Sequence, residues 1–220
     1  MQINLLHRPA QALAQVWLEP NEAIVAESGA MVGMTPNVQM QTQSGGLMKG
    51  LKRMFGGESF FRNTFTSHNG NGELLLAHAL SGDMAVLEMT QHGYFLQSSA
   101  FIASSPAVNI DTKAGGFRGF FSGAGVFVLK ATSQGPGQVL VGGFGGIQEL
   151  MCDGNIVIDT GHLVAWDATL NYTVGKSGAG WIASFLSGEG LVCHFKGQGR
   201  IWIQTRNPVE YGRAVGSQLP

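Results

Sequence analysis

The feature that most constrains this chain is a series of glycine and apolar motifs that occurs three times along it. Each copy has a strand start built from small residues and, further on, a glycine that opens an apolar run. The strand starts are Ser28-Gly29-Ala30-Met31-Val32, Ser99-Ala100-Phe101-Ile102-Ala103 and Thr160-Gly161-His162-Leu163-Val164. The later glycines, Gly72, Gly137 and Gly199, are 65 and 62 residues apart. Self-similarity at a nearly fixed period indicates a fold of repeated units.

The repeat divides the 220 residues into three units, which we place at residues 1–79, 80–148 and 149–220. Units of this size are near the lower limit for an independent core, so we expect them to pack together as one assembly. Short β-branched and aromatic runs predict strands, for example at 84–88, 139–141 and 201–204, and glycine-containing segments at 152–155 and 196–199 predict turns. A short helix is predicted near 208–215. The pattern is typical of an all-β fold.

Each unit also carries a bulky apolar insert between glycines, which is the main candidate for an interface. The first insert, residues 46–55, has apolar residues at helical spacing opposite basic ones and predicts two or three helical turns. The candidate interface residues are Leu51, Met54, Phe55, Phe117, Phe120, Phe121, Trp181 and Phe185. The candidate basic contacts are Lys49, Lys52, Arg53 and Arg118. We expect packing between units or chains, with docking of a protein partner and peripheral membrane contact as the less favoured alternatives.

The charge content limits the classes of partner. Charged residues make up 12% of the chain, about half the usual share, which suits a β protein that buries surface in a homo-oligomer. A net charge of −1 disfavours broad attraction to nucleic acid or anionic membranes. The sequence shows no secretory signal pattern and no apolar stretch of about 20 residues that would span a membrane. We therefore expect a cytoplasmic protein.

The motifs that would carry chemistry are weak. The six histidines are isolated, without a His-x-His or His-x-x-x-His pair, and we expect no metal and no other cofactor. The glycine run 142–146 lacks the Gly-Lys-Ser/Thr of a phosphate-binding loop and favours close backbone approach or a bulge. Cys152 and Cys193 are expected as free thiols in or near a core. Without a Gly-x-Ser-x-Gly elbow or paired carboxylates, the sequence favours a protein that is not an enzyme.

Several segments in order resemble a known family, the one named for "altered inheritance of mitochondria". They include Glu27-Ser28-Gly29-Ala30-Met31-Val32, the Gly-Glu-Ser-Phe-Phe run at 57–61, Gly115-Gly116-Phe117 and Gly188-Glu189-Gly190-Leu191. The resemblance implies three tandem β units with a pseudo-threefold arrangement. Each would be like the subunit of the tryptophan RNA-binding attenuator protein, a short double-stranded β-helix. It implies no catalytic residues.

The three copies share glycines and apolar residues but not charged residues. A protein that bound a symmetric ligand through all three copies would keep the same polar residues in each copy. The sequence therefore favours a non-enzymatic binding or scaffold protein that self-associates through apolar surfaces. A small-molecule or RNA binder that uses clefts between the units is the alternative, and an enzyme with a site built across units is a third hypothesis.

Overall fold

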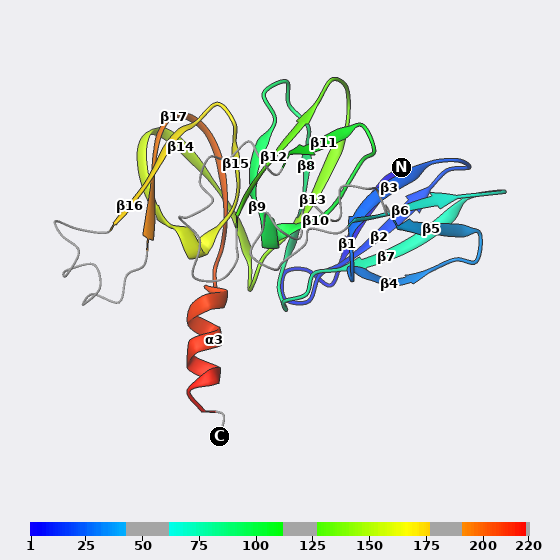
Figure 1. Ribbon diagram of the computed structural model, residues 1–220, viewed down its shortest axis with the longest axis horizontal. Helices are drawn as coiled ribbons and strands as arrows, with labels where there is room; N and C mark the ends of the chain where they lie inside the picture. The colour runs from blue at the N-terminus through cyan, green and yellow to red at the C-terminus, as the bar shows by residue number, and fades with distance from the viewer. Residues whose placement is uncertain (43–61, 112–126, 177–190, 219–220) are drawn as a thin grey trace.

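In the computed structural model, the described residues are 1–42, 62–111, 127–176 and 191–218, and their regular secondary structure is almost entirely β-strand (Figure 1). The predicted all-β class is confirmed, and the predicted C-terminal helix is present as α3 (Pro208–Gly216). The predicted helix at 46–55 lies outside the described residues. So do all the candidate interface and basic-contact residues: Leu51, Met54, Phe55, Phe117, Phe120, Phe121, Trp181, Phe185, Lys49, Lys52, Arg53 and Arg118.

The strands fall along the chain into three sets, preceded by β1 (Gln2–Leu6). Set 1 contains β2 (Leu13–Leu18), β3 (Ala23–Glu27), β4 (Met31–Met34), β5 (Val38–Thr42), β6 (Arg62–Ser67) and β7 (Gly72–Ala77). Set 2 contains β8 (Met84–Glu88), β9 (Tyr94–Gln97), β10 (Phe101–Ser104), β11 (Val108–Asp111), β12 (Val128–Ser133) and β13 (Gln138–Gly142). Set 3 contains β14 (Ile147–Asp159), β15 (Leu163–Asp167), β16 (Asn171–Lys176) and β17 (Leu191–Gln204). The 3-10 turns η1 (Ser98–Ala100) and η2 (Thr160–His162) precede β10 and β15.

The same antiparallel pairings occur in each set. The first strand pairs with the sixth and the sixth with the third, and we call these three strands the first half-sheet: β2-β7-β4 in set 1 and β8-β13-β10 in set 2. The second strand pairs with the fifth and the fifth with the fourth, and these form the second half-sheet: β3-β6-β5 and β9-β12-β11. In set 3, the long strands β14 and β17 each supply two strands in succession, and β15 and β16 complete the two half-sheets.

Neighbouring sets are joined by one strand pair each. β3 pairs with β10, and β9 pairs with β15. Each junction fuses the second half-sheet of one set to the first half-sheet of the next, which gives the orders β5-β6-β3-β10-β13-β8 and β11-β12-β9-β15-β17-β14. We call these two the composite sheets. The first half-sheet of set 1, extended by β1, and the second half-sheet of set 3 remain at the two ends of the molecule (Figure 1).

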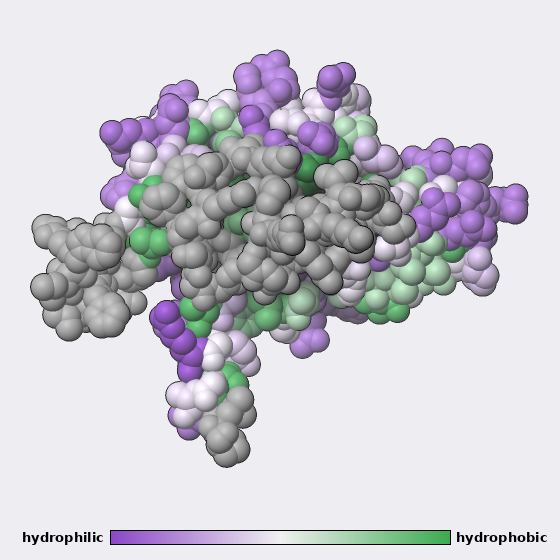
Figure 2. All heavy atoms as spheres, in the orientation of Figure 1, coloured by the Kyte–Doolittle hydropathy of each residue, from purple (hydrophilic) through white to green (hydrophobic). Residues whose placement is uncertain are grey.

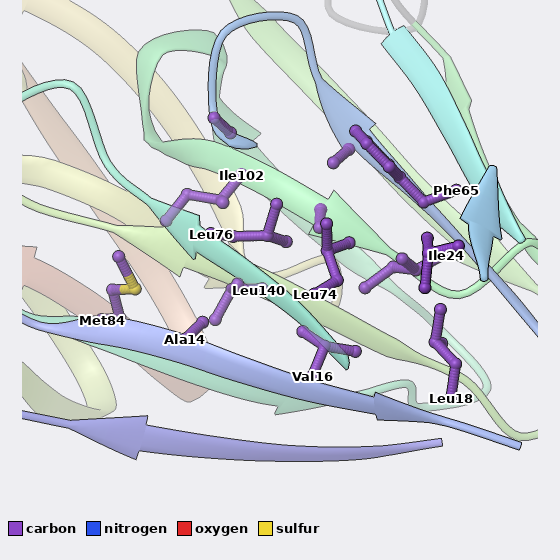
Figure 3. Packing of buried hydrophobic residues seen from close by; sticks show 14 of the residues in the cluster. Ala14, Val16, Leu18, Ile24, Phe65, Leu74, Leu76, Met84, Ile102 and Leu140 are labelled. Atoms are coloured by element: carbon purple, nitrogen blue, oxygen red, sulfur yellow. The ribbon is translucent and has the colours of Figure 1, made fainter. Parts of the chain in front are cut away.

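Three hydrophobic clusters lie between these layers. The first cluster fills the space between β1-β2-β7-β4 and the first composite sheet, where Val16 and Leu74 face Ile24, Phe65 and Leu140 (Figure 3). The second cluster lies between the two composite sheets. The third packs the second composite sheet against the second half-sheet of set 3. Each core therefore uses residues from two consecutive sets, as expected for units too small to bury a core alone.

Two predicted turns are wrong. Residues 152–155 and 196–199 lie inside β14 and β17, which pair without interruption along 13 positions. Gly154 and Gly197 stand directly opposite each other, and both have a φ of 115°. Only glycine adopts this backbone conformation readily, so the paired glycines let the two strands change direction together while the ladder continues. Asp153 accordingly lies in a strand, where it accepts a hydrogen bond from Gln198 Nε2 at 2.9 Å.

The three pairing patterns do not by themselves test the finer parts of the sequence interpretation. The likeness of each unit to the attenuator protein subunit, the pseudo-threefold arrangement and the boundaries at 1–79, 80–148 and 149–220 stay predictions.

Candidate functional site

One ion pair with a buried carboxylate connects the start of the chain to set 2. Asp83 is 2% exposed, and its two carboxylate oxygens accept hydrogen bonds from Arg8 Nε at 2.7 Å and Nη2 at 2.9 Å. Burial works against the charged carboxylate, but the hydrogen bonds from Arg8 and from the Met84 N–H outweigh it and hold the pKa of Asp83 below its usual value. The pair therefore has a structural role, since both carboxylate oxygens of Asp83 accept hydrogen bonds from Arg8 and one also accepts from the Met84 N–H.

A second polar cluster stabilises the junction between sets 2 and 3. Arg200 donates to both carboxylate oxygens of Asp167 at 3.3 Å and to the hydroxyl of Tyr94 at 3.1 Å. Its guanidinium lies 4.9 Å from the centre of the Trp202 ring, which adds a cation–π contact. Tyr94 in turn donates to the carbonyl of Glu88. This cluster again connects strands of the scaffold.

His78 and His162 each contact a backbone carbonyl oxygen. His78 Nε2 lies 2.9 Å from the carbonyl oxygen of Ser99, and His162 Nδ1 lies 2.7 Å from that of Gln204. His162 belongs to η2 rather than to a strand. A side chain at Gly142 would bring its Cβ within 2.6 Å of the His78 ring, so the close backbone approach expected of the glycine run 142–146 is confirmed there.

The two cysteines are free and buried, as expected. Burial raises the pKa of the Cys193 thiol to about 12, so the reactive thiolate is strongly disfavoured near neutral pH. Among the described residues, no three His, Cys, Asp or Glu side chains gather as a metal site would require.

Two open hollows lie on the described surface. One of about 350 Å³ is lined by Trp17 and Glu19, and one of about 480 Å³ is lined by Glu88 and Gln91. The first lies between β1 and set 1, with Met1 and Gln2 in its lining, and the second is formed by strand ends and turns of set 2. The lining of each hollow includes a glutamate, Glu19 or Glu88, but among the described residues neither lining includes a histidine or a cysteine.

The clearest irregularity lies on β4, the outer strand of the first half-sheet of set 1. Its counterparts β10 and β15 are the third strands of their sets, and their residues are almost entirely buried. β4 instead exposes Met31, Val32 and Met34, and Val32 is 57% exposed. Among the described strands, β4 pairs only with β7, so its other edge has no partner. Figure 2 shows apolar residues gathered where β4 and β7 lie.

The opposite end of the molecule has a matching irregularity. The second part of β14, residues 155–159, corresponds to β3 and β9, which join one set to the next. Within the described residues this part of β14 pairs only with β17. Val157 is 54% exposed, whereas its counterpart Val25 is 8% exposed. The molecule thus ends in two unpaired apolar strand edges, which form the candidate site.

Sequence reasoning did not single out these edges. Met31-Val32 was recognised as a copy of Phe101-Ile102 and Leu163-Val164, and that repetition was the available signal. The motif itself does not show which of the three copies lacks a neighbouring strand. No described residue tests whether the predicted inserts contribute to the same surface.

A carboxyl group lies close to one of the junctions. Glu27, at the end of β3, corresponds to Gln97 at the end of β9. Burial raises the pKa of Glu27 to about 7, because desolvation disfavours the charged carboxylate. The neutral form of Glu27 is therefore populated near neutral pH.

Antiparallel half-sheets fused edge to edge into a layered stack define an all-β fold, in which β4 and residues 155–159 are open edges among the described strands. The family model described as "Mitochondrial biogenesis AIM24" matches residues 3–206. The chain belongs to this family, which confirms the family resemblance.

Two relatives from Streptococcus pyogenes agree with this assignment. A protein described as uncharacterized, from serotype M6, is 32% identical over 219 residues, covering 94% of this chain and 87% of the relative. A crystal structure of another S. pyogenes protein has a TM-score of 0.81 and 29% identity, covering 99% of both chains. Within the described residues, no helix has the length and apolar character needed to cross a membrane.

Proposed function

We propose that this protein is a non-enzymatic scaffold that associates with further copies of itself through apolar surfaces. The observation that carries the proposal is the exposure of Met31, Val32 and Met34 on β4, at positions that are buried in β10 and β15. Full burial of a side chain such as valine or methionine contributes about 1.5–3 kcal/mol. A surface of this kind gains free energy by association.

The composition of the two edges supports the same reading. Proteins that must stay monomeric protect open edges with lysine, proline or a covering segment, because an unpaired strand edge attracts other strands. β4 contains neither charge nor proline, and residues 155–159 contain one charged residue, Asp159. The side chain of Asp159 accepts a hydrogen bond from the Gly161 N–H and so caps η2.

The placement of the polar groups supports a scaffold over an enzyme. Arg8 and Asp83 join the turn after β1 to the residue before β8, Asp167 and Arg200 connect β15 with β17, and the most perturbed thiol, Cys193, is held in its unreactive form. A catalytic site needs at least one such group directed to a substrate. A cytoplasmic location belongs to the same proposal.

Size-exclusion chromatography with light scattering tests the proposal. We expect a mass above the 23.3 kDa of one chain that falls as the protein is diluted. A mass of one chain at every concentration up to about 100 μM would contradict self-association, because that limit corresponds to only about 5–6 kcal/mol of binding free energy.

The alternative of a small-molecule or RNA binder in clefts between the units stays a prediction. Thermal-shift measurements with amino acids, nucleotides and single-stranded RNA address it directly. A ligand that raises the unfolding temperature would favour it, since binding to the native state stabilises by mass action.

A further inference from the structure

We propose that copies of this chain join head to tail by pairing β14 residues 155–159 of one copy with β4 of the next. The second half-sheet of set 3 and the first half-sheet of set 1 then form a third composite sheet, shared between two chains. This inference rests on the proposed self-association and names its surface. Its partner is a second copy of the same chain.

The two junctions inside the chain provide the template. In both, the second strand of one set pairs antiparallel with the third strand of the next: β3 with β10, and β9 with β15. The second strand of set 3 and the third strand of set 1 are left without such a partner among the described strands. The two open edges are therefore the two complementary halves of a junction already used twice.

A shared irregularity aligns the third strands residue by residue. Each has a register shift against its sixth strand, between Met31 and Gly33, between Phe101 and Ala103, and between Leu163 and Ala165. Gly33 therefore corresponds to Ala103 and Ala165. The next residue, Met34, corresponds to Ser104 and Trp166.

The second strands align through the turns that follow them. Gln97 immediately precedes η1 and Asp159 immediately precedes η2, and Glu27 occupies the same place before β4. Counting back two residues makes Val157 the counterpart of Val25 and Phe95. In the existing junctions Ser104 stands opposite Val25, and Trp166 stands opposite Phe95. The template thus places Met34 of one copy opposite Val157 of another, and Gly33 opposite Ile158.

Side chains at the existing junctions enter the core of the neighbouring set. Ile102 of set 2 is 1% exposed and belongs to the first cluster, and Val164 of set 3 is fully buried in the second cluster. Val32 occupies the same strand position in set 1, and no described set precedes set 1. Pairing with a second copy would direct Val32 toward the third cluster of that copy.

A residue of the second strand of a set likewise packs against the core of the following set. Phe95, on the second strand of set 2, packs against the third cluster, with its ring centre 5.8 Å from that of Trp166. Val157 is the equivalent residue of set 3. In the proposed junction it packs beside Met34 in the way that Phe95 packs beside Trp166. Both open residues are apolar, so the pair needs no polar partner.

In sets 2 and 3, one face of the first half-sheet also packs into the core of the preceding set. Leu140 and Trp202, on the sixth strands of sets 2 and 3, are buried in the core of the preceding set. The corresponding residue of set 1 is Leu75, because it stands opposite Gly33 as Leu140 stands opposite Ala103. The exposed Trp17 lies on the same face, two pairs along the neighbouring ladder. Gln15 and Glu73 lie on this face too and are hydrogen-bonded to each other at 2.6 Å, so the surface that would cover the third cluster of another copy combines apolar residues with one internally paired polar contact.

Closure within one chain is excluded by the arrangement of the sets. Set 1 and set 3 lie at opposite ends of the molecule with set 2 between them (Figure 1). The two edges therefore meet only between copies. Because the joined surfaces differ, the interface is heterologous and propagates into a closed ring or an open filament.

Single-edge variants test the direction of pairing. Met34→Lys blocks the β4 edge, and Val157→Lys blocks the β14 edge, because an isolated lysine at the junction must be desolvated. Each variant alone should weaken association by about tenfold or more. An equimolar mixture should form a 1:1 dimer and stop there, since each variant retains one intact edge and the two edges complement each other.

Charge reversal tests the register. The double variant Met34→Lys/Val157→Lys should stay monomeric, because like charges directly opposite each other destabilise a strand pair. The double variant Met34→Lys/Val157→Glu places opposite charges at the proposed pair and should recover association relative to either lysine variant. Met40→Lys is the matched control: Met40 is an exposed methionine on the edge strand β5, outside the proposed junction, and its replacement should leave association unchanged.

The outcomes separate the two proposals. A wild-type chain that stays monomeric overturns self-association and the junction together. A wild-type chain that associates while both lysine variants associate equally well overturns the junction and leaves self-association standing. Loss of association with Met40→Lys, or a mixture that forms no dimer, also contradicts head-to-tail pairing. Circular dichroism confirms that each variant is folded.

Discussion

Removal of the Arg8 side chain provides the sharpest test of how the start of the chain is held to set 2. Arg8→Met keeps much of the aliphatic stem but removes both charge-assisted hydrogen bonds to Asp83, at 2.7 and 2.9 Å. Asp83 is left as a carboxylate that is 2% exposed, with backbone N–H groups as its remaining donors. We expect a clear loss of stability.

The magnitude follows from the geometry. A hydrogen bond to a charged group contributes about 1.5–3 kcal/mol, and removal of one partner of a buried pair costs about 3–5 kcal/mol. Arg8 itself is half exposed, so water screens part of the interaction and lowers the value. We therefore expect Arg8→Met to reduce the free energy of unfolding by about 2–3 kcal/mol at pH 7.

The pH dependence has a definite sign. In the wild type the pKa of Asp83 is lowered, so its contribution to stability is present above its ordinary pKa and is lost as the pH falls through the folded value. In Arg8→Met, burial dominates and raises that pKa, so protonation at low pH relieves the cost. The difference between the two proteins should therefore be largest near pH 7 and shrink toward about pH 4.

Urea unfolding followed by tryptophan fluorescence measures these values, in the Met34→Lys/Val157→Lys background so that association does not add to stability. Arg8→Met/Asp83→Asn should recover much of the loss, because no buried charge remains. Arg213→Met is the control, since its ion pair with Glu210 is exposed and should contribute under about 0.5 kcal/mol. A loss below about 0.5 kcal/mol for Arg8→Met, or no recovery in the double variant, would refute the reasoning.

Three further predictions concern buried groups. Because the folded pKa of Glu27 is raised to about 7, its contribution to stability is present below pH about 4.5 and lost as the pH rises through about 7; Glu27→Gln should therefore be stabilising at pH 8 but not at pH 4, as unfolding curves at the two pH values would show. The Cys193 thiol, with its pKa raised to about 12, should resist an aromatic disulfide reagent at pH 8 until urea unfolds the chain, and rapid labelling of the native protein would contradict its burial. Ile102→Ala should lose about 2–5 kcal/mol of stability through the cavity it leaves, whereas Val32→Ala at the equivalent exposed position should stay within about 0.5 kcal/mol in the monomer.

Much of the fold was predictable because its determinants are local. The strand at 84–88 was predicted with the bounds that the structure gives to β8, since a short apolar run between turn formers is a local signal of a buried strand. The helix near 208–215 was predicted equally well; Asn207 caps it by accepting hydrogen bonds from the N–H groups of Val209 and Glu210. The predicted turns at 152–155 and 196–199 were wrong because Gly154 and Gly197 face each other in the pairing of β14 with β17. That pairing joins residues far apart in the chain and is not local.

The sequence by itself determined the all-β class, the threefold recurrence of its motifs and the family to which the chain belongs. These depend on glycine, on apolar periodicity and on the order of motifs along the chain. Only the tertiary structure decided that Ile102 and Val164 are buried while Val32 is exposed, although all three occupy the same place in the motif. The physical reason is that burial in this architecture comes from the neighbouring set, and among the described residues no set precedes set 1. The candidate site therefore lies where the series of strand junctions between sets ends.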